Sequence, residues 1–267
     1  MRPLLLLPLL LPFAATAETP AARRADALEA ARAGHWRRAE ELQLQAIALC
    51  LPCKAETLAY LRSELANYLV LGGFPEAAIP LWKQSLTELP AASEERITQW
   101  LGLGVALHAA GRTTDAMAAW KQACTLAAPG SREQAACRFN VAVARIDTEP
   151  VWSELEEILP TLLTAEGPMS RATALIQTAH AAILAKHAHR ARALLDHADT
   201  IVERELSAAH PFRSVIFATR AQLAEAEGNG RQARRWRKLS RKSAPAHGWE
   251  PHTVSLDDLR RAAGEHK

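Results

Sequence analysis

Hydrophobic and small residues in the middle of the chain recur at helical spacing, in two blocks separated by a glycine. Trp100, Leu103 and Leu107 are three and four residues apart, so they lie on one face of a predicted helix. Gly111 follows that face and is typical of the left-handed residue that ends a helix. A second block, residues 116–123, again has its apolar positions at helical spacing. The pattern therefore predicts two antiparallel helices joined by a short turn.

The same pattern occurs twice without a gap. Residues 103–126 overlay residues 65–88 at an offset of 38 positions, with the Trp-Lys-Gln of 120–122 on the Trp-Lys-Gln of 82–84. A proline follows each copy, at Pro90 and Pro129. Self-similarity at a fixed period is typical of stacked helical units rather than of one closed core. We expect the repeated tryptophans to pack between the helices of each unit.

One full unit resembles the tetratricopeptide repeat (TPR) family. The residues that carry the resemblance are Trp100, Leu103, Gly104, Leu107, Gly111, Ala116, Trp120 and Ala123. The longer spacing from Ala191 to Ala233 and the His210-Pro211 pair are similar to the kinesin-light-chain type of this repeat. The resemblance implies an all-α fold, a right-handed superhelical solenoid of about six antiparallel helix pairs over residues 18–243, which binds other proteins.

Three segments depart from the repeat pattern. Gln43 stands where the family has a large apolar residue. Pro160 is expected to interrupt or end the helix that opens near Trp152, because proline lacks the N–H that a helix interior uses. The repeat stops after residue 243, and residues 244–267 are expected to form a loop and a short capping helix.

The composition agrees with an all-α fold. The 267 residues include only 12 glycines and 5% aromatic residues, with alanine and leucine very frequent. A β-sandwich or barrel needs more β-branched residues and glycine turns. With 49% hydrophobic residues, 23% charged residues and a formal net charge of +3, the chain has the profile of a protein with a buried core rather than of a disordered one.

Residues 1–17 have the pattern of a signal peptide. Arg2 supplies a positive start, residues 4–13 form an apolar run, and Ala15-Thr16-Ala17 is typical of a cleavage site. The apolar run is shorter than the ~20 residues that span a bilayer. We therefore expect an exported, bacterial-type protein, periplasmic or secreted after cleavage near Ala17, with no stable membrane insertion.

Export changes the interpretation of the 4 cysteines. An even number in an oxidising compartment favours disulfides, here Cys50 with Cys53 and Cys124 with Cys137, each pair lying across a predicted turn. Small residues around Cys124 and Cys137 permit the close approach that a disulfide needs. Two alternatives stay open: a thiol-redox or metal-handling role for Cys50 and Cys53, and free thiols.

The TPR resemblance also implies a concave groove lined by the first helix of each pair. Carried onto this chain, the groove residues are Tyr60, Ser63, Asn67, Leu101, Val105, His108, Phe139, Val143, Ile176 and His180. Leu101 and Val105 stand where a carboxylate clamp would place polar or basic residues, so a partly apolar groove for a protein or peptide partner is expected. The alternative is that some of these side chains pack against neighbouring helices.

Positive charge is concentrated near the end of the repeats. The basic residues are Arg231, Arg234, Arg235, Arg237, Lys238, Arg241 and Lys242, with no acidic residue between Glu227 and Glu250. For an exported protein this pattern favours an anionic lipid, polysaccharide or acidic protein surface over nucleic acid. The alternative is a solvated face of the last helix, with Ala233 and Leu239 turned inward.

Motifs for catalysis are missing from the sequence. It contains no Gly-x-Ser-x-Gly, no His-Glu-x-x-His and no phosphate-binding loop. His180, His187, His189 and His197 have no spacing typical of a metal site. We therefore expect a non-enzymatic protein without catalytic residues, metal or cofactor.

Overall fold

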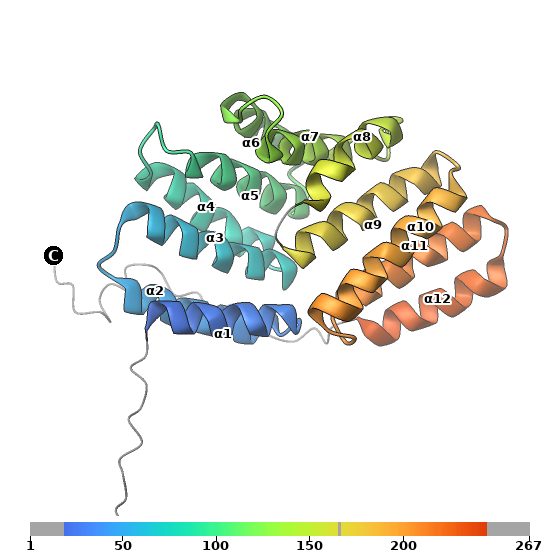
Figure 1. Ribbon diagram of the computed structural model, residues 1–267, viewed down its shortest axis with the longest axis horizontal. Coiled ribbons are helices and arrows are strands. Elements are labelled where there is room, and N and C mark those ends of the chain that lie inside the picture. Colours follow the sequence, from blue (N-terminus) through green and yellow to red (C-terminus); the bar gives the residue numbers. More distant parts are fainter. Residues whose placement is uncertain (1–18, 165–166, 245–267) are drawn as a thin grey trace, which may run out of the picture.

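The structure is a computed structural model that describes residues 19–164 and 167–244. Within these residues the chain forms twelve α-helices and one π-helical turn, η1, in a curved stack (Figure 1). Their bounds are α1 Pro20–Arg32, α2 Trp36–Cys50, α3 Ala55–Leu71, α4 Pro75–Glu88, α5 Glu95–Ala109, α6 Thr113–Leu126, α7 Arg132–Ala144, α8 Trp152–Leu163, α9 Pro168–Leu184, α10 Ala188–Ile201, η1 Val202–Leu206, α11 Phe212–Ala226 and α12 Gly230–Ser243. The expected signal peptide and all of the expected capping segment after residue 244 lie outside the described residues.

Consecutive helices form six antiparallel pairs, from α1/α2 to α11/α12, and each pair packs against the next (Figure 1). First helices also contact the first helices of neighbouring pairs, as α3 contacts α5 and α9 contacts α11. Over the part of the chain that the structure describes, there is no β-strand. The all-α solenoid predicted from the repeat pattern is confirmed.

Five of the pairs share one turn geometry, which closes the first helix and starts the second. In the α5–α6 turn, Gly111 has a φ of 77°, and the N–H of Arg112 donates to the carbonyl oxygen of Leu107 at 2.8 Å. This six-residue bond satisfies a carbonyl at the helix end, which has no partner within the helix. The α9–α10 turn is built in the same way, with Lys186 at a φ of 63° in place of glycine. The exception is the fourth pair, in which the residues between α7 and α8 form a longer connection.

The repeated tryptophans lie in the core, as predicted. Trp82 and Trp120 are each 1% exposed, and each ring lies against a glycine of α5. A Cβ atom added to Gly104 would lie 2.2 Å from Trp120 Nε1, so only glycine allows α6 to approach α5 this closely. The indole N–H of Trp120 donates to the carbonyl oxygen of Leu101 at 3.1 Å, which satisfies its polar atom inside the core.

Gln43 is also buried, although it departs from the apolar pattern. Its side-chain amide donates to the carbonyl oxygen of Leu61 at 2.9 Å and to Glu64 at 3.1 Å, both on α3. A buried polar group is tolerated when it is hydrogen-bonded. The hydrogen bonds of Gln43 therefore add polar contacts to the apolar packing of α2 on α3, where Ile47 lies in one cluster with Leu58 and Leu61.

The expectation that Pro160 interrupts or ends its helix is wrong. Helix α8 runs from Trp152 to Leu163 with Pro160 inside it. Proline removes one backbone hydrogen bond, but Leu155, Ile158 and Leu162 of the same helix are buried in the core. Their burial stabilises α8 by several kcal/mol, at about 1.5–3 kcal/mol for each large apolar side chain, and outweighs the lost bond.

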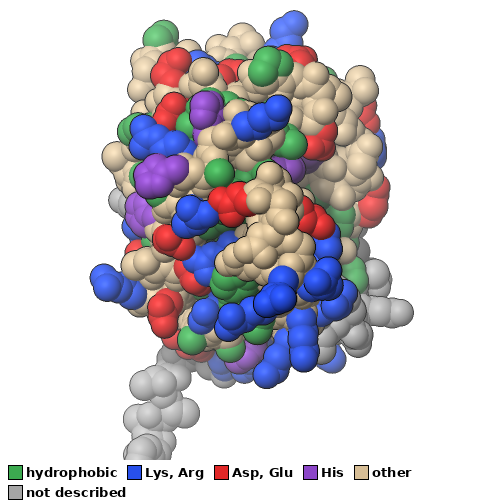
Figure 2. Space-filling view, turned by 90° about the vertical axis from the view of Figure 1, so that its right-hand side faces the viewer, with side chains coloured by type: hydrophobic (Ala, Val, Ile, Leu, Met, Phe, Trp, Pro, Cys, Tyr) green, Lys and Arg blue, Asp and Glu red, His purple; other side chains and the backbone are tan. Residues whose placement is uncertain are grey.

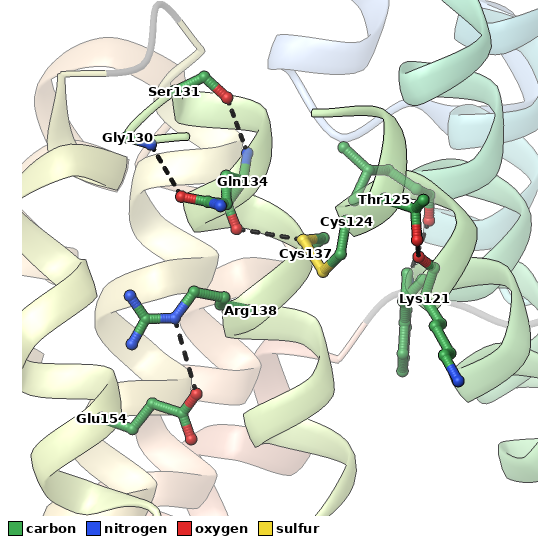
Figure 3. Close-up of a disulfide and its surroundings, with 11 residues drawn as sticks. Lys121, Cys124, Thr125, Gly130, Ser131, Gln134, Cys137, Arg138 and Glu154 are labelled. Atoms are coloured by element: carbon green, nitrogen blue, oxygen red, sulfur yellow. Dashed lines mark hydrogen bonds and ion pairs between the residues drawn. A yellow bond between two sulfur atoms is a disulfide. The ribbon is translucent and has the colours of Figure 1, made fainter. Parts of the chain in front are cut away.

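Both expected cysteine pairs are joined. Cys50, the last residue of α2, pairs with Cys53 in the following loop, with Cα atoms 5.5 Å apart. Cys124 of α6 pairs with Cys137 of α7, with Cα atoms 5.6 Å apart (Figure 3). The second disulfide therefore connects the third helix pair to the fourth. Beside it, Ser131 caps α7 by accepting from the N–H of Gln134 at 3.1 Å (Figure 3).

Candidate partner-binding surfaces

Three of the predicted groove residues form an exposed surface on α3 and α5, which we call the first-helix surface. Tyr60 is 49% exposed, Val105 is 37% exposed, and Asn67 is exposed as well. Because α3 and α5 are packed against each other, these side chains belong to neighbouring first helices. The surface combines an aromatic ring, an aliphatic side chain and an amide.

The position of Tyr60 is set by a charged side chain from α1. Arg24 donates to the phenol oxygen of Tyr60 at 2.5 Å and to both carboxylate oxygens of Glu64, at 2.8 and 2.9 Å. The guanidinium carbon also lies 4.8 Å from the centre of the Tyr60 ring. Partial burial, followed by the charge of Glu64, raises the pKa of the Tyr60 phenol, so the side chain stays neutral at physiological pH.

The other predicted groove residues are less accessible. Phe139, Ser63 and Ile176 are buried, so they contribute to the core rather than to an open groove. Ser63 is hydrogen-bonded to Gln99 of α5 at 2.8 Å. The partly buried residues of the set are Leu101, His108, Val143 and His180. Fewer of the predicted groove residues are therefore accessible than the family geometry implies.

The basic residues of α12 are all exposed, while the opposite side of the helix is packed. Ala233 is buried, and the ring of Trp236 stacks on Phe217 of α11 with centroids 5.5 Å apart. Arg237 forms an ion pair with Glu225 of α11. Figure 2 shows a band of basic side chains across the lower part of this face of the molecule.

The stack curves so far that its first and last pairs touch, which the repeat pattern of the sequence does not predict. The ring of Trp36, at the start of α2, lies edge-on to the ring of His210, with centroids 5.4 Å apart. Gly34 lies against Pro211 so closely that an added Cβ would be 2.2 Å from Pro211 Cδ. We call this contact between the α1–α2 turn and residues 210–211 the seam.

His210 is fully buried at the seam. Its Nδ1 accepts a hydrogen bond from the N–H of Phe212 at 3.2 Å, which fixes the ring at the start of α11. Burial lowers the pKa of His210 to about 4, because the charged imidazolium would lose its hydration. The imidazole is therefore neutral at physiological pH and packs as an aromatic ring.

Beside the seam lies a cleft of about 830 Å³, which we call the seam cleft. One wall is the α1–α2 turn and the first residues of α2, including Trp36, Arg37 and Arg38. The other walls are residues 208–213 and the end of α12, where Lys242 lies. The only hint in the sequence was the His210-Pro211 pair, which does not reveal that these residues meet the first helix pair.

The described residues give little support for a metal site or a membrane-spanning helix. Among residues 19–164 and 167–244, no group of three potential metal ligands is brought together. His187 lies 5.4 Å from the ring of Trp152, so it packs on an aromatic side chain. None of the helices in these two ranges combines the length and the hydropathy that crossing a bilayer requires.

A scan against protein-family models finds no match, and a search of curated proteins finds none either. Among solved structures, BtubC (BKLC) from P. vanneervenii is similar with a TM-score of 0.51 and 17% identity, over 88% of this chain and 97% of that chain. TPR-like repeats of a putative kinesin light chain from Podosopora anserina are similar at a TM-score of 0.46 and 20% identity, over 71% of this chain and 96% of that chain. At these identities the likeness concerns the fold. The chain therefore has the fold of a TPR-like α-solenoid.

Proposed function

We propose that this protein is a binding scaffold, and that the first-helix surface takes a segment of a partner protein. The observation that carries the proposal is the exposure of Tyr60 and Val105 on neighbouring first helices of a TPR-like solenoid. Exposed aromatic and aliphatic side chains bury area when a partner docks, and a few such anchors dominate affinity. Arg24 holds the Tyr60 ring in one position, which lowers the entropy lost on binding.

Site-specific photo-crosslinking tests this surface. We would place a photo-reactive amino acid at position 105 and, as a control, at position 121, since Lys121 is exposed on the second helix α6. The expected result is a defined crosslinked protein from position 105 only, which Tyr60→Ala abolishes without changing the circular dichroism spectrum. Equal products from both positions, or none from position 105, would contradict the proposal.

We also propose that the protein works outside the cytosol. Support comes from the signal-like pattern of residues 1–17 and from the pairing of all four cysteines in two disulfides. Disulfides persist mainly in oxidising compartments. Mass spectrometry of the protein from fractionated cells tests this: we expect a mature chain that starts near Glu18 in the exported fraction, and a full-length cytosolic chain would overturn it.

A further inference from the structure

We propose that the seam cleft and the adjoining basic side of α12 together bind an extended acidic segment of a partner protein. This binding site lies apart from the first-helix surface. It would stand even if that surface bound nothing.

The first observation is a contrast in charge pairing. The arginines of α9, α10 and α11 are paired, for example Arg171 with Glu205 at 2.5 Å, Arg192 with Glu227 at 2.5 Å, and Arg220 with Asp196 at 2.7 Å. On α12 only Arg237 is paired within the described ranges. The basic residues left without an ion pair there are Arg231, Arg234, Arg235, Lys238, Arg241 and Lys242.

These six residues follow helical spacing, so they form one stripe along α12, which we call the basic stripe. Arg231 and Arg235, Arg234 and Lys238, and Lys238 and Lys242 are each four residues apart. Like charges at this spacing destabilise a helix. An anionic ligand along the stripe would remove that repulsion, which gives such a ligand favourable binding energy.

The basic stripe ends at the seam cleft, because Lys242 belongs to both. Arg37 and Arg38 add positive charge to the cleft walls, against the single lining carboxylate of Glu41, which lies 3.2 Å from Arg37 and 3.3 Å from Arg38. Arg213 also lines the cleft and is paired with Asp199 at 3.7 Å. The excess of positive charge makes the cleft a favourable site for carboxylates.

The start of α2 also favours an anion in the cleft. Helix α2 begins there without an acidic residue in its first turn and without a side-chain cap, so the positive end of its dipole is not compensated locally.

Shape favours a protein segment over a membrane surface. The apolar side of α12 is packed against α11 through Trp236 and Phe217, so this helix has no apolar face left to insert into lipid. The cleft is concave, and a flat bilayer could not follow the stripe and also enter it. An extended chain could, because the stripe spans roughly 16 Å at 1.5 Å per residue and matches about five residues of extended peptide.

The test uses the full chain with a fluorescein-labelled peptide of alternating Glu and Ser, and an otherwise identical peptide with Gln in place of Glu. Fluorescence anisotropy would be measured at low and at physiological salt. Arg38→Glu with Lys242→Glu alters the cleft, and Arg231→Glu with Arg235→Glu alters the stripe. Lys83→Glu with Lys121→Glu is the matched control, since both lysines are exposed on other helices and the net charge changes equally.

We expect the Glu peptide alone to bind, more weakly at higher salt, with both basic double variants losing at least about tenfold in affinity and the control staying within about twofold. Equal losses in all three variants, or no binding by the native chain, would overturn the proposal. If the cleft variant kept its affinity for the Glu peptide, the cleft would not be part of the binding site, and the proposal as stated would be overturned. Binding to phosphatidylserine-containing vesicles that the peptide does not displace would assign the surface to a membrane instead.

Discussion

Two glycines of α5 each lie against a tryptophan ring, and neither position has room for a methyl group. Gly104 lies under Trp120 of its own pair, and Gly102 lies under Trp82 of the preceding pair, where an added Cβ would be 2.4 Å from the ring. Protein cores are packed densely enough that such an overlap forces side chains or backbone to shift. These two glycines therefore set the distance between α5 and both second helices.

We expect Gly104→Ala to lower the free energy of unfolding by about 1–3 kcal/mol, because the new methyl group overpacks the site beside Trp120. Urea unfolding followed by tryptophan fluorescence measures the change. Gly230→Ala is the control: the nearest neighbour of its added Cβ would be the flexible end of Arg234 at 3.8 Å, so no overpacking is expected there. Equal effects of the two substitutions would count against the packing explanation.

The burial of His210 predicts that the stability of the folded protein depends on pH. The folded protein holds the pKa of His210 at about 4, whereas an unfolded histidine titrates near 6.5. Between these values the unfolded state binds a proton that the folded state does not, so stability falls as the pH drops from about 6.5 to about 4 and then levels off for this group. The expected loss is about 3 kcal/mol.

Unfolding midpoints of the native chain and of His210→Leu at neutral pH and at pH near 4 isolate this contribution. The leucine variant should lose less stability than the native chain over that interval, even if it is less stable at neutral pH. Parallel pH profiles of the two proteins would show that His210 titrates normally in the fold.

At the residue scale, the sequence predicts the role of Trp120 and Gly104 because both belong to the repeated pattern. It does not predict the hydrogen bonds of Gln43, because the pattern marks this residue only as an exception. The acceptors of those bonds, Leu61 and Glu64, lie on the next helix. Phe139 was expected in the groove and is buried instead. Exposure at such positions depends on how closely adjacent first helices approach, which a single unit's pattern does not contain.

At the scale of the helices, the disulfide between α6 and α7 is expected to stabilise the stack more than the disulfide that follows α2. Cys124 and Cys137 are 13 residues apart and belong to different helix pairs. Cys50 and Cys53 are 3 residues apart and close only a loop. In the chain-entropy account, a disulfide that closes a longer loop removes more freedom from the unfolded state.

We therefore expect Cys124→Ser with Cys137→Ser to lower the free energy of unfolding by about 3 kcal/mol, and Cys50→Ser with Cys53→Ser by about 2 kcal/mol or less. Thermal unfolding with and without reductant checks both values. If reductant destabilised the double variant at 124 and 137 as strongly as the native chain, the stabilising role of this disulfide would be refuted.

The number and type of helices follow from the spacing of apolar residues. The residue at which a helix ends does not always follow from that spacing. Pro160 suggested an early end to its helix, yet α8 continues to Leu163. The local penalty of proline can be seen in the sequence. The tertiary burial of Leu155 and Ile158 that offsets it depends on α7 and α9, which no local pattern specifies.

For the whole molecule, the decisive contact is the seam between the first and last pairs. Gly34 and Pro211 meet there although 177 positions separate them in the sequence. Repeat spacing predicts how each pair packs on the next, whereas the closing contact depends on the small rotation between pairs summed over the stack. This is why the seam and its cleft could not be predicted from the sequence.

Gly34→Ala should open the seam, because its Cβ would collide with Pro211. Gly73→Ala is a matched control, since Gly73 has a similarly positive φ of 92° and nothing within 4 Å of an added Cβ. Both variants carry the same backbone strain, about 1 kcal/mol or more. We expect small-angle X-ray scattering to show a larger radius of gyration for Gly34→Ala alone, and identical radii would refute a closing role for the contact.

Contact between the two ends of a repeat stack changes which of its units unfold first. An open solenoid behaves as a one-dimensional array, whose terminal units fray first because they have a neighbour on one side only. Here the α1–α2 turn also contacts residues 210–211, so hydrogen exchange should protect the start of α2 better than the outer helix of an open stack. Inserting or deleting one pair would move Trp36 away from His210, so this contact would form only with the present number of pairs.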